Sequence, residues 1–179
     1  QLAGVSYDPR SLAGLADFAA ARAREHAGRT GDLLCLVAFC LLIRRRVLEE
    51  IGGLDEGFGQ GNYEDTDFCL RAFLAGWTSL MAEDSFVHHF GSRSFVAGKI
   101  DYAAQITAKF EIFKRKWNLP ADACQGGPVP LEALVGDGFQ PGQHFEPLAA
   151  GPRLAPVTVP AWELDRRIAT AEDFFARDR

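Results

Sequence analysis

The sequence lacks the features that mark membrane-spanning and nucleic-acid-binding chains. Its longest apolar run, LLCLVAFCLLI at residues 33–43, is too short, because a helix needs about 20 apolar residues to cross a bilayer. No basic block offsets the net charge of −5, so neither nucleic acid nor an anionic membrane surface is indicated as a partner. No signal-peptide pattern opens the chain. These absences predict a cytoplasmic protein that is not transmembrane.

The four cysteines lack the CxxC spacing that is typical of zinc sites and of thioredoxin-like motifs. Two lie in the apolar run and one lies in a predicted helix, which favours reduced thiols in a core. No internal repeat and no low-complexity tract is present. What remains is a chain of 179 residues, 47% hydrophobic and 24% charged, the composition of one ordinary globular domain.

Hydrophobic spacing predicts a mixed α/β layer structure. We expect a helix capped by Ser11 and ended near Gly28, and a strand over residues 33–43 that is buried on both faces. The later expected elements are a short helix over 44–51, a helix over 65–75, strands over 77–82 and 85–90 joined by a turn at 83–84, and an amphipathic helix over 101–117. From residue 120 the chain is rich in proline and glycine, and a final helix is predicted over 161–179.

The segment GNYEDTDFCLR, residues 61–71, places three carboxylates directly ahead of an apolar helical pattern. One carboxylate at a helix start is explained by capping, since it accepts backbone N–H bonds and meets the positive end of the helix dipole. Three carboxylates exceed that need. Asp67 can pair with Arg71 one turn later, while the remaining acids either raise one pKa, which suits a general base, or bind a cation.

A second polar segment, FVHHFGSRS, follows at residues 86–94. Neighbouring side chains of a strand point to opposite faces, so only one of His88 and His89 can face a given site. A lone histidine is more often a filler of core or surface than a ligand. The following loop nevertheless offers Arg93 and Ser94 for phosphate oxygens, and an imidazole with nearby carboxylates would suit Mn²⁺ or another divalent ion.

Several motifs in a fixed order resemble a known family. FCLLIRRRVLEEIGGLDEGFGQGNYEDTDFCLRAFLAGW, then DSFVHHFGSRSF, then FKRKW are similar to the C-terminal half of a family-two glycosyltransferase domain. The similarity is to bacterial members that often occur in larger multi-domain chains, and it runs from about Leu34 to Leu119. It implies part of a GT-A-like fold, a mixed sheet flanked by helices, in which this half binds the acceptor.

The resemblance also implies roles on the acceptor side. Asp65, the aspartate of the family's ED motif, would be the general base that takes the proton from an acceptor hydroxyl as its oxygen attacks the anomeric carbon with inversion. Glu64 would orient the acceptor, with Asn62 and Gly61 beside it. The nucleotide-sugar donor would transfer its sugar to a saccharide or another hydroxyl acceptor.

On the donor side, the resemblance implies a divalent metal ion, Mn²⁺ or Mg²⁺, that neutralises the departing diphosphate. His88 is the expected ligand and His89 the alternative. Arg93 and Ser94 are the expected contacts to phosphate. One departure from the family pattern is Ala38–Phe39, where a glycine and a small residue are common, so the acceptor wall is expected to differ in shape.

The family's nucleotide-binding strands and its DxD acid pair have no counterpart before Leu34. We therefore divide the chain into residues 1–119, the acceptor-side half of the domain, and residues 120–179, a tail. A sheet without its other half exposes an edge, which predicts a homodimer through that sheet or a covering segment. Because nothing here would hold the base and ribose, this chain alone is expected not to transfer sugar.

Two other functions are compatible with the same residues. The first is a non-catalytic remnant of the fold that binds a saccharide or another protein. The second is metal-dependent hydrolysis by Glu64, Asp65 and His88.

Overall fold

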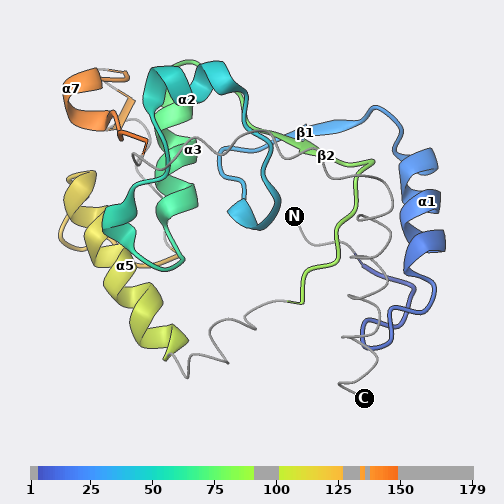
Figure 1. Ribbon diagram of the computed structural model, residues 1–179. Coiled ribbons are helices and arrows are strands. Elements are labelled where there is room, and N and C mark those ends of the chain that lie inside the picture. The colour runs from blue at the N-terminus through green and yellow to red at the C-terminus, as the bar shows by residue number, and fades with distance from the viewer. Residues whose placement is uncertain (1–3, 91–100, 127–133, 136–137, 149–179) are drawn as a thin grey trace. The chain divides into compact units, whose positions relative to one another are not determined.

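The computed structural model describes residues 4–90, 101–126, 134–135 and 138–148. The chain divides into two compact units, residues 1–148 and 149–179, and every described residue belongs to the first (Figure 1). The described elements are α1 (Leu15–Glu25), β1 (Thr30–Asp32), η1 (Ala38–Cys40), α2 (Arg45–Ile51), η2 (Glu56–Phe58), α3 (Glu64–Leu74), β2 (Leu80–Ala82), α5 (Tyr102–Lys116) and α7 (Pro141–His144). In these residues no helix is long and apolar enough for a transmembrane span.

The sheet of the described part is a pair of antiparallel strands, β1 and β2 (Figure 1). Thr30 lies opposite Ala82, and Asp32 lies opposite Leu80. Helices and strands together confirm a mixed α/β class. The expected mixed sheet is not found in the described residues, because the one ladder they contain is antiparallel.

The predicted buried strand over residues 33–43 is wrong. The segment contains the short η1 helix, and its side chains are half-buried or exposed, with Leu42 99% exposed. Only its first residue bonds beside β2, where the N–H of Leu33 donates to the carbonyl of Ser79. Further along, the backbone bonds to side chains of α3: the N–H of Leu36 donates to Cys69 Sγ, and the N–H of Ala38 donates to Asp65 Oδ2. Donors bound to side chains in this way are not available to a ladder.

The predicted pair of strands after α3 is only partly correct. Of residues 77–82, Leu80–Ala82 form β2, and the turn at Glu83–Asp84 is present. Residues 85–90 form no strand, so that prediction is wrong. Aromatic packing holds this segment in place of a ladder, since the Phe86 ring lies edge-on to Phe18 of α1, with centroids 4.8 Å apart.

The four helices predicted within residues 11–117 are confirmed, with shifts of a few residues at their ends. The first begins at Leu15, and Ser11 does not cap it; its hydroxyl donates to Asp8 in the preceding turn. α5 is capped by Asp101, whose carboxylate accepts from the N–H of Ala104. Arg93, Ser94 and the predicted final helix over 161–179 lie outside the described residues.

Two hydrophobic clusters position α3 from opposite sides. One buries Leu70 against α5 and is formed by Phe58, Leu70, Phe110, Phe113, Trp117 and Leu119. The other buries Phe68 and Ala72 against Val47 and Ile51 of α2. Figure 1 shows α2 and α3 packed side by side. Because apolar side chains cover both flanks of α3, its first turn is fixed on a rigid support.

A buried polar network joins α3 to α5 and to the chain after α7. The predicted Asp67–Arg71 pair is confirmed: both side chains are fully buried, and Arg71 Nε lies 2.8 Å from Asp67 Oδ2. The indole N–H of Trp117 donates to Asp67 Oδ1 at 3.0 Å. Lys116 Nζ forms ion pairs with Asp67, with Asp55 and with Glu146. Lys116 of the amphipathic helix α5 is therefore half-buried, with 16% of its side chain exposed.

Candidate functional site

The predicted acceptor residues form a tight backbone reversal into α3. Gly61, Asn62 and Tyr63 have consecutive φ angles of 67°, 69° and 71°. Left-handed backbone is uncommon for residues other than glycine, and such conformations concentrate at sites where geometry serves a function. Glu64 and Asp65 follow at once as the first two residues of α3. The reversal therefore fixes where these two carboxylates lie.

Asp65 is held by backbone N–H groups on both oxygens. Oδ1 accepts from the N–H of Thr66 at 2.8 Å, and Oδ2 accepts from the N–H of Ala38 at 3.2 Å. The capping interpretation needs correction, because Asp65 lies inside the helix and the cap position, Tyr63, makes no side-chain cap bond. Each carboxylate oxygen has two lone-pair positions, so Oδ2 keeps one for a hydroxyl proton.

Glu64 lies in a different setting. Burial raises the pKa of its carboxyl, and the neighbouring charge of Asp65 adds to this effect, although Lys109 opposes it. Glu64 Oε2 is buried and has no hydrogen-bond partner among the described residues. Two adjacent acids of α3 thus differ: Asp65 accepts a backbone N–H on each oxygen, whereas Glu64 carries an oxygen without a partner in the described residues.

Helix α5 contributes residues to this site that the sequence did not single out. The Tyr102 hydroxyl donates to Asn62 Oδ1 at 3.1 Å, and the Gln105 amide donates to the carbonyl of Gln60 at 2.6 Å. Asn62 Nδ2 and Gln105 Oε1 are, like Glu64 Oε2, buried without a partner in the described part of the chain. The sequence carried one sign of this, since Tyr102 and Gln105 are three residues apart and so lie on the same face of a predicted helix.

The two histidines have separate neighbours. His88 Nδ1 shares a hydrogen bond with the Tyr7 hydroxyl, and its ring meets Phe90 edge-on. His89 stacks on Phe39, with ring centroids 4.7 Å apart and an interplanar angle of 16°. Phe39 is the neighbour of Ala38, whose N–H binds Asp65. His89, which stacks on Phe39, is therefore the histidine whose contacts lead to the acids, and His88 is not.

The expected metal site does not assemble from the described residues. They contain no group of three or more histidine, cysteine, aspartate or glutamate side chains that could hold a metal ion. Aromatic rings of Tyr7 and Phe90, and not carboxylates, surround His88. Metal binding by His88 therefore stays a prediction, with ligands that would have to come from outside the described residues.

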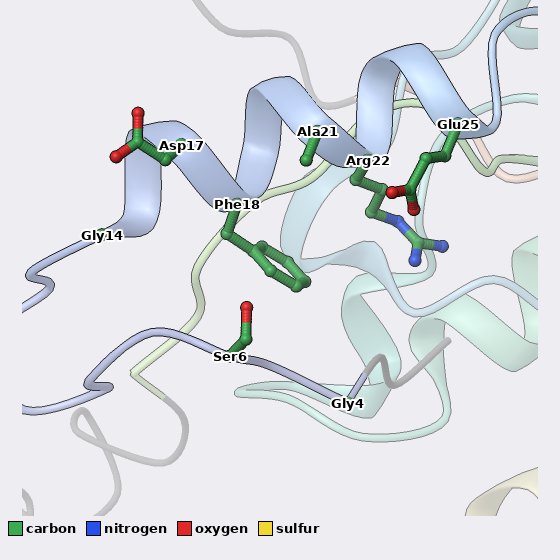
Figure 2. Close-up of a pocket in the computed structure, with 8 residues that line it drawn as sticks. All are labelled: Gly4, Ser6, Gly14, Asp17, Phe18, Ala21, Arg22 and Glu25. Carbon is green, nitrogen blue, oxygen red and sulfur yellow. The ribbon is translucent and has the colours of Figure 1, made fainter.

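Two cavities lie elsewhere in the described part. A mainly apolar cavity of about 770 Å³ is bounded by residues 36–37 and 39–44, by Arg22 and Val47, by Phe68, Cys69 and Ala72 of α3, and by residues 76–82 and 85–87. The other, of about 510 Å³, opens between α1 and the N-terminal segment. Figure 2 shows Phe18 and Arg22 projecting from α1 toward the segment that carries Ser6. Neither cavity is lined by the predicted catalytic, acceptor-binding or metal-binding residues.

Comparisons of the chain with protein-family models, with curated proteins and with solved structures found no match.

Proposed function

We propose that this chain is the acceptor-side half of an inverting glycosyltransferase with a GT-A-like fold. The family resemblance over about Leu34–Leu119 suggests the activity. The observation that supports it in the structure is the first turn of α3, where a three-residue left-handed reversal presents two adjacent carboxylates. A structural cap needs one acid at the cap position, and neither Glu64 nor Asp65 occupies it.

In the proposed reaction Asp65 is the general base. Its carboxylate accepts the proton of an acceptor hydroxyl while that oxygen attacks the anomeric carbon of a nucleotide sugar and the nucleoside diphosphate leaves. The backbone N–H groups of Thr66 and Ala38 keep the carboxylate in one orientation, which is the preorganisation that proton transfer requires.

The groups beside Asp65 suit a ligand with several hydroxyls. Asn62 Nδ2 offers a donor, while Glu64 Oε2 and Gln105 Oε1 offer acceptors, and all three lack a partner in the described residues. Leaving a buried polar atom unpaired costs about 1–3 kcal/mol, so a binding partner would relieve this cost. Because each sugar hydroxyl both donates and accepts, a small movement of these side chains would let them bind a diol of a saccharide.

We derive no step through a metal ion, and the binding of such an ion by His88 stays a prediction. The contacts to the nucleotide, and the phosphate contacts expected of Arg93 and Ser94, stay predictions. Donor binding is assigned to the half of the domain that has no counterpart before Leu34. The cytoplasmic location and the homodimer likewise stay predictions.

The test uses a polypeptide that carries both halves. The reading frame upstream of Gln1 should encode nucleotide-binding strands and an acid pair, and the joined protein should transfer sugar. Asp65→Asn should then lower kcat by about 10²–10⁴-fold, the usual contribution of a general base, with the KM for the nucleotide sugar unchanged. Glu64→Gln should raise the KM for the acceptor.

Asp122→Asn is the matched control, since Asp122 is exposed and lies outside the site. Full activity of Asp65→Asn, or an upstream sequence without nucleotide-binding strands, would contradict the proposal. Calorimetry of the present chain with nucleotide sugars and Mn²⁺ should detect no binding tighter than about millimolar. Sub-micromolar affinity would place the donor site in this chain.

A second candidate function, protein binding, is favoured by exposed apolar side chains at the 770 Å³ cavity. Val37, Phe39 and Leu42 are 48%, 46% and 99% exposed, and contiguous apolar surface marks interaction sites. This function predicts that Asp65→Asn leaves every property unchanged, whereas Leu42→Asp abolishes binding of the partner.

A further inference from the structure

Two cysteines from distant parts of the sequence meet beside α3. Cys35 belongs to the segment before η1, and Cys69 lies in the middle of α3. Their thiols share a hydrogen bond. Both also contact the Leu36 peptide: Cys69 Sγ accepts from its N–H at 3.3 Å, and the Cys35 and Cys69 sulfurs lie 3.9 Å and 3.7 Å from its carbonyl oxygen. The two sulfur atoms are therefore neighbours with a fixed mutual orientation.

The two thiols are chemically unequal. The hydrogen bond from Cys35 lowers the pKa of Cys69 to about 7, with a further contribution from the Leu36 N–H, although burial opposes the shift. The same hydrogen bond and burial raise the pKa of Cys35. At neutral pH about half of the molecules accordingly hold one thiolate beside one thiol. The thiolate is the nucleophilic form of cysteine, and the adjacent thiol can attack it once it has been oxidised.

The apolar cavity gives a small oxidant a route to this pair. Cys69 is 2% exposed, yet it lines the 770 Å³ cavity together with Leu36 and Phe68. The lining is mainly apolar but includes Arg22 and Arg44, and a cavity of this size admits a small neutral molecule such as hydrogen peroxide. Cys40 and Cys124 are exposed and unbridged, and they provide internal comparisons for the same reaction.

We propose that Cys35 and Cys69 are a redox pair that hydrogen peroxide converts to a reversible intramolecular disulfide. The Cys69 thiolate attacks one peroxide oxygen, the O–O bond breaks, and hydroxide leaves, so that Cys69 becomes a sulfenic acid. The Cys35 sulfur then attacks the Cys69 sulfur, the S–S bond forms, and the sulfenic oxygen leaves as water with the Cys35 proton. The hydroxide recovers the proton lost by Cys69. Two thiols are oxidised, and one peroxide is reduced to two waters.

The disulfide would fix the segment that supports Asp65. It would tie Cys35 to α3. Cys35 is only three residues before Ala38, whose N–H binds the Asp65 carboxylate. A cross-link between residues 35 and 69 also removes loop-closure entropy from the unfolded chain. Oxidation should therefore raise the thermal midpoint of unfolding and leave the fold unchanged.

The test is to treat the full chain with hydrogen peroxide and to follow thiols and mass. We expect two of the four thiols to be lost, the intact mass to fall by two hydrogens, and a peptide map to join residues 35 and 69. Dithiothreitol should restore both thiols. The rate of loss should increase with pH with a midpoint near the Cys69 pKa of about 7. The double variant Cys40→Ser, Cys124→Ser should react in the same way.

Single variants separate the two roles. Cys35→Ser should stop at a Cys69 sulfenic acid, which dimedone traps, and Cys69→Ser should leave Cys35 unoxidised. A melting curve first establishes that each variant is folded; because Cys69 is buried, Cys35→Ser carries the test if Cys69→Ser does not fold. The proposal is overturned if wild type forms only intermolecular disulfides through Cys40 or Cys124, or if Cys69 remains reduced.

Discussion

Asp67 lies at the centre of the buried network although it belongs to the acidic segment that the sequence marked for function. Its carboxylate is fully buried and accepts from Arg71, Lys116 and Trp117. A buried charge is tolerated only when it is paired and hydrogen-bonded. The acid that looked like one of three similar residues thus has a structural role, and Glu64 and Asp65 alone remain as candidates for chemistry.

Asp67→Asn should destabilise the fold by about 3–5 kcal/mol, the usual cost of removing one partner of a buried ion pair. The amide would leave Arg71 without a carboxylate in a site that excludes water. Urea unfolding followed by circular dichroism measures the change, with Asp122→Asn as the exposed control, which should change stability by less than about 0.5 kcal/mol. A loss below about 1 kcal/mol would contradict the importance of this pair.

His144 should make stability depend on pH. Burial lowers the pKa of its imidazole, and Lys116 and Arg71 lower it further, although Asp67 opposes them. Below histidine's ordinary pKa of about 6.5, the unfolded chain therefore binds a proton that the folded chain resists, and stability falls as the pH decreases through this window. Unfolding free energies at a series of pH values should show this loss in wild type and a weaker dependence in His144→Asn. Parallel curves for the two proteins would refute the assignment.

At the scale of elements, the sequence predicted helices well and strands poorly. The helices carry their own signals, such as the spacing of Phe110, Phe113 and Trp117 on α5 and the glycine after α2. The apolar run at residues 33–43 gave no such local information, because length and hydrophobicity describe a buried strand and a segment lining a cavity equally well. The conformation of this run depends on side chains far along the chain, such as Asp65 and Cys69. No pattern within the run reveals these partners.

The end of α2 depends on a glycine that touches another segment. Gly52 has φ 82° and ψ −162°, a conformation essentially reserved for glycine, and it forms an isolated parallel bridge with Glu146. A Cβ built on Gly52 would lie 1.7 Å from the carbonyl oxygen of Glu146. Gly76 shares the φ of 82° but has open space around a Cβ.

Gly52→Ala should therefore cost more than Gly76→Ala. A backbone with this positive φ costs a residue with a Cβ about 1–3 kcal/mol at either position, and the collision adds about 1–3 kcal/mol at Gly52 alone. Guanidinium unfolding of the two variants under identical conditions measures the difference. Equal losses would mean that the contact between Gly52 and Glu146 does not form in solution.

At the scale of the whole molecule, the chain beyond residue 119 contributes to the described core. Leu134 packs on the cluster around Phe113, and Phe139 packs on the cluster around Phe68. Glu146 accepts from Lys116, and its backbone bonds to both Ile51 and Gly53. The proline and glycine content that suggested a separate tail is visible in the sequence, but these contacts over long separations are not.

A chain shortened to residues 1–126 should be less stable than one shortened to residues 1–148. The shorter chain leaves Gly53 N–H without its acceptor and removes one of the carboxylates that pair with Lys116. Each buried donor left unpaired costs about 1–3 kcal/mol. The midpoint of urea unfolding should fall for 1–126 and stay close to that of the full chain for 1–148. Identical midpoints for both would show that the later segment adds nothing.

The candidate site was predictable as residue types but not as an arrangement. The ED pair and its place at the start of a helix follow from the sequence, whereas the approach of Tyr102 and Gln105 depends on how α5 packs against the loop before α3. The metal ligand was expected from His88, whose aromatic surroundings come from Tyr7, eighty-one positions earlier. Partners at such separations are set by tertiary packing and leave no local pattern.

Trp117 gives the molecule an optical reporter of its own. Its indole donates to Asp67, and its ring centroid lies 5.0 Å from that of His144. Tryptophan emission responds to adjacent charge and to exposure of the ring to water. The emission of Trp117 should therefore change when α3, α5 and α7 separate around it. Fluorescence can thus follow assembly of the described unit without any attached dye.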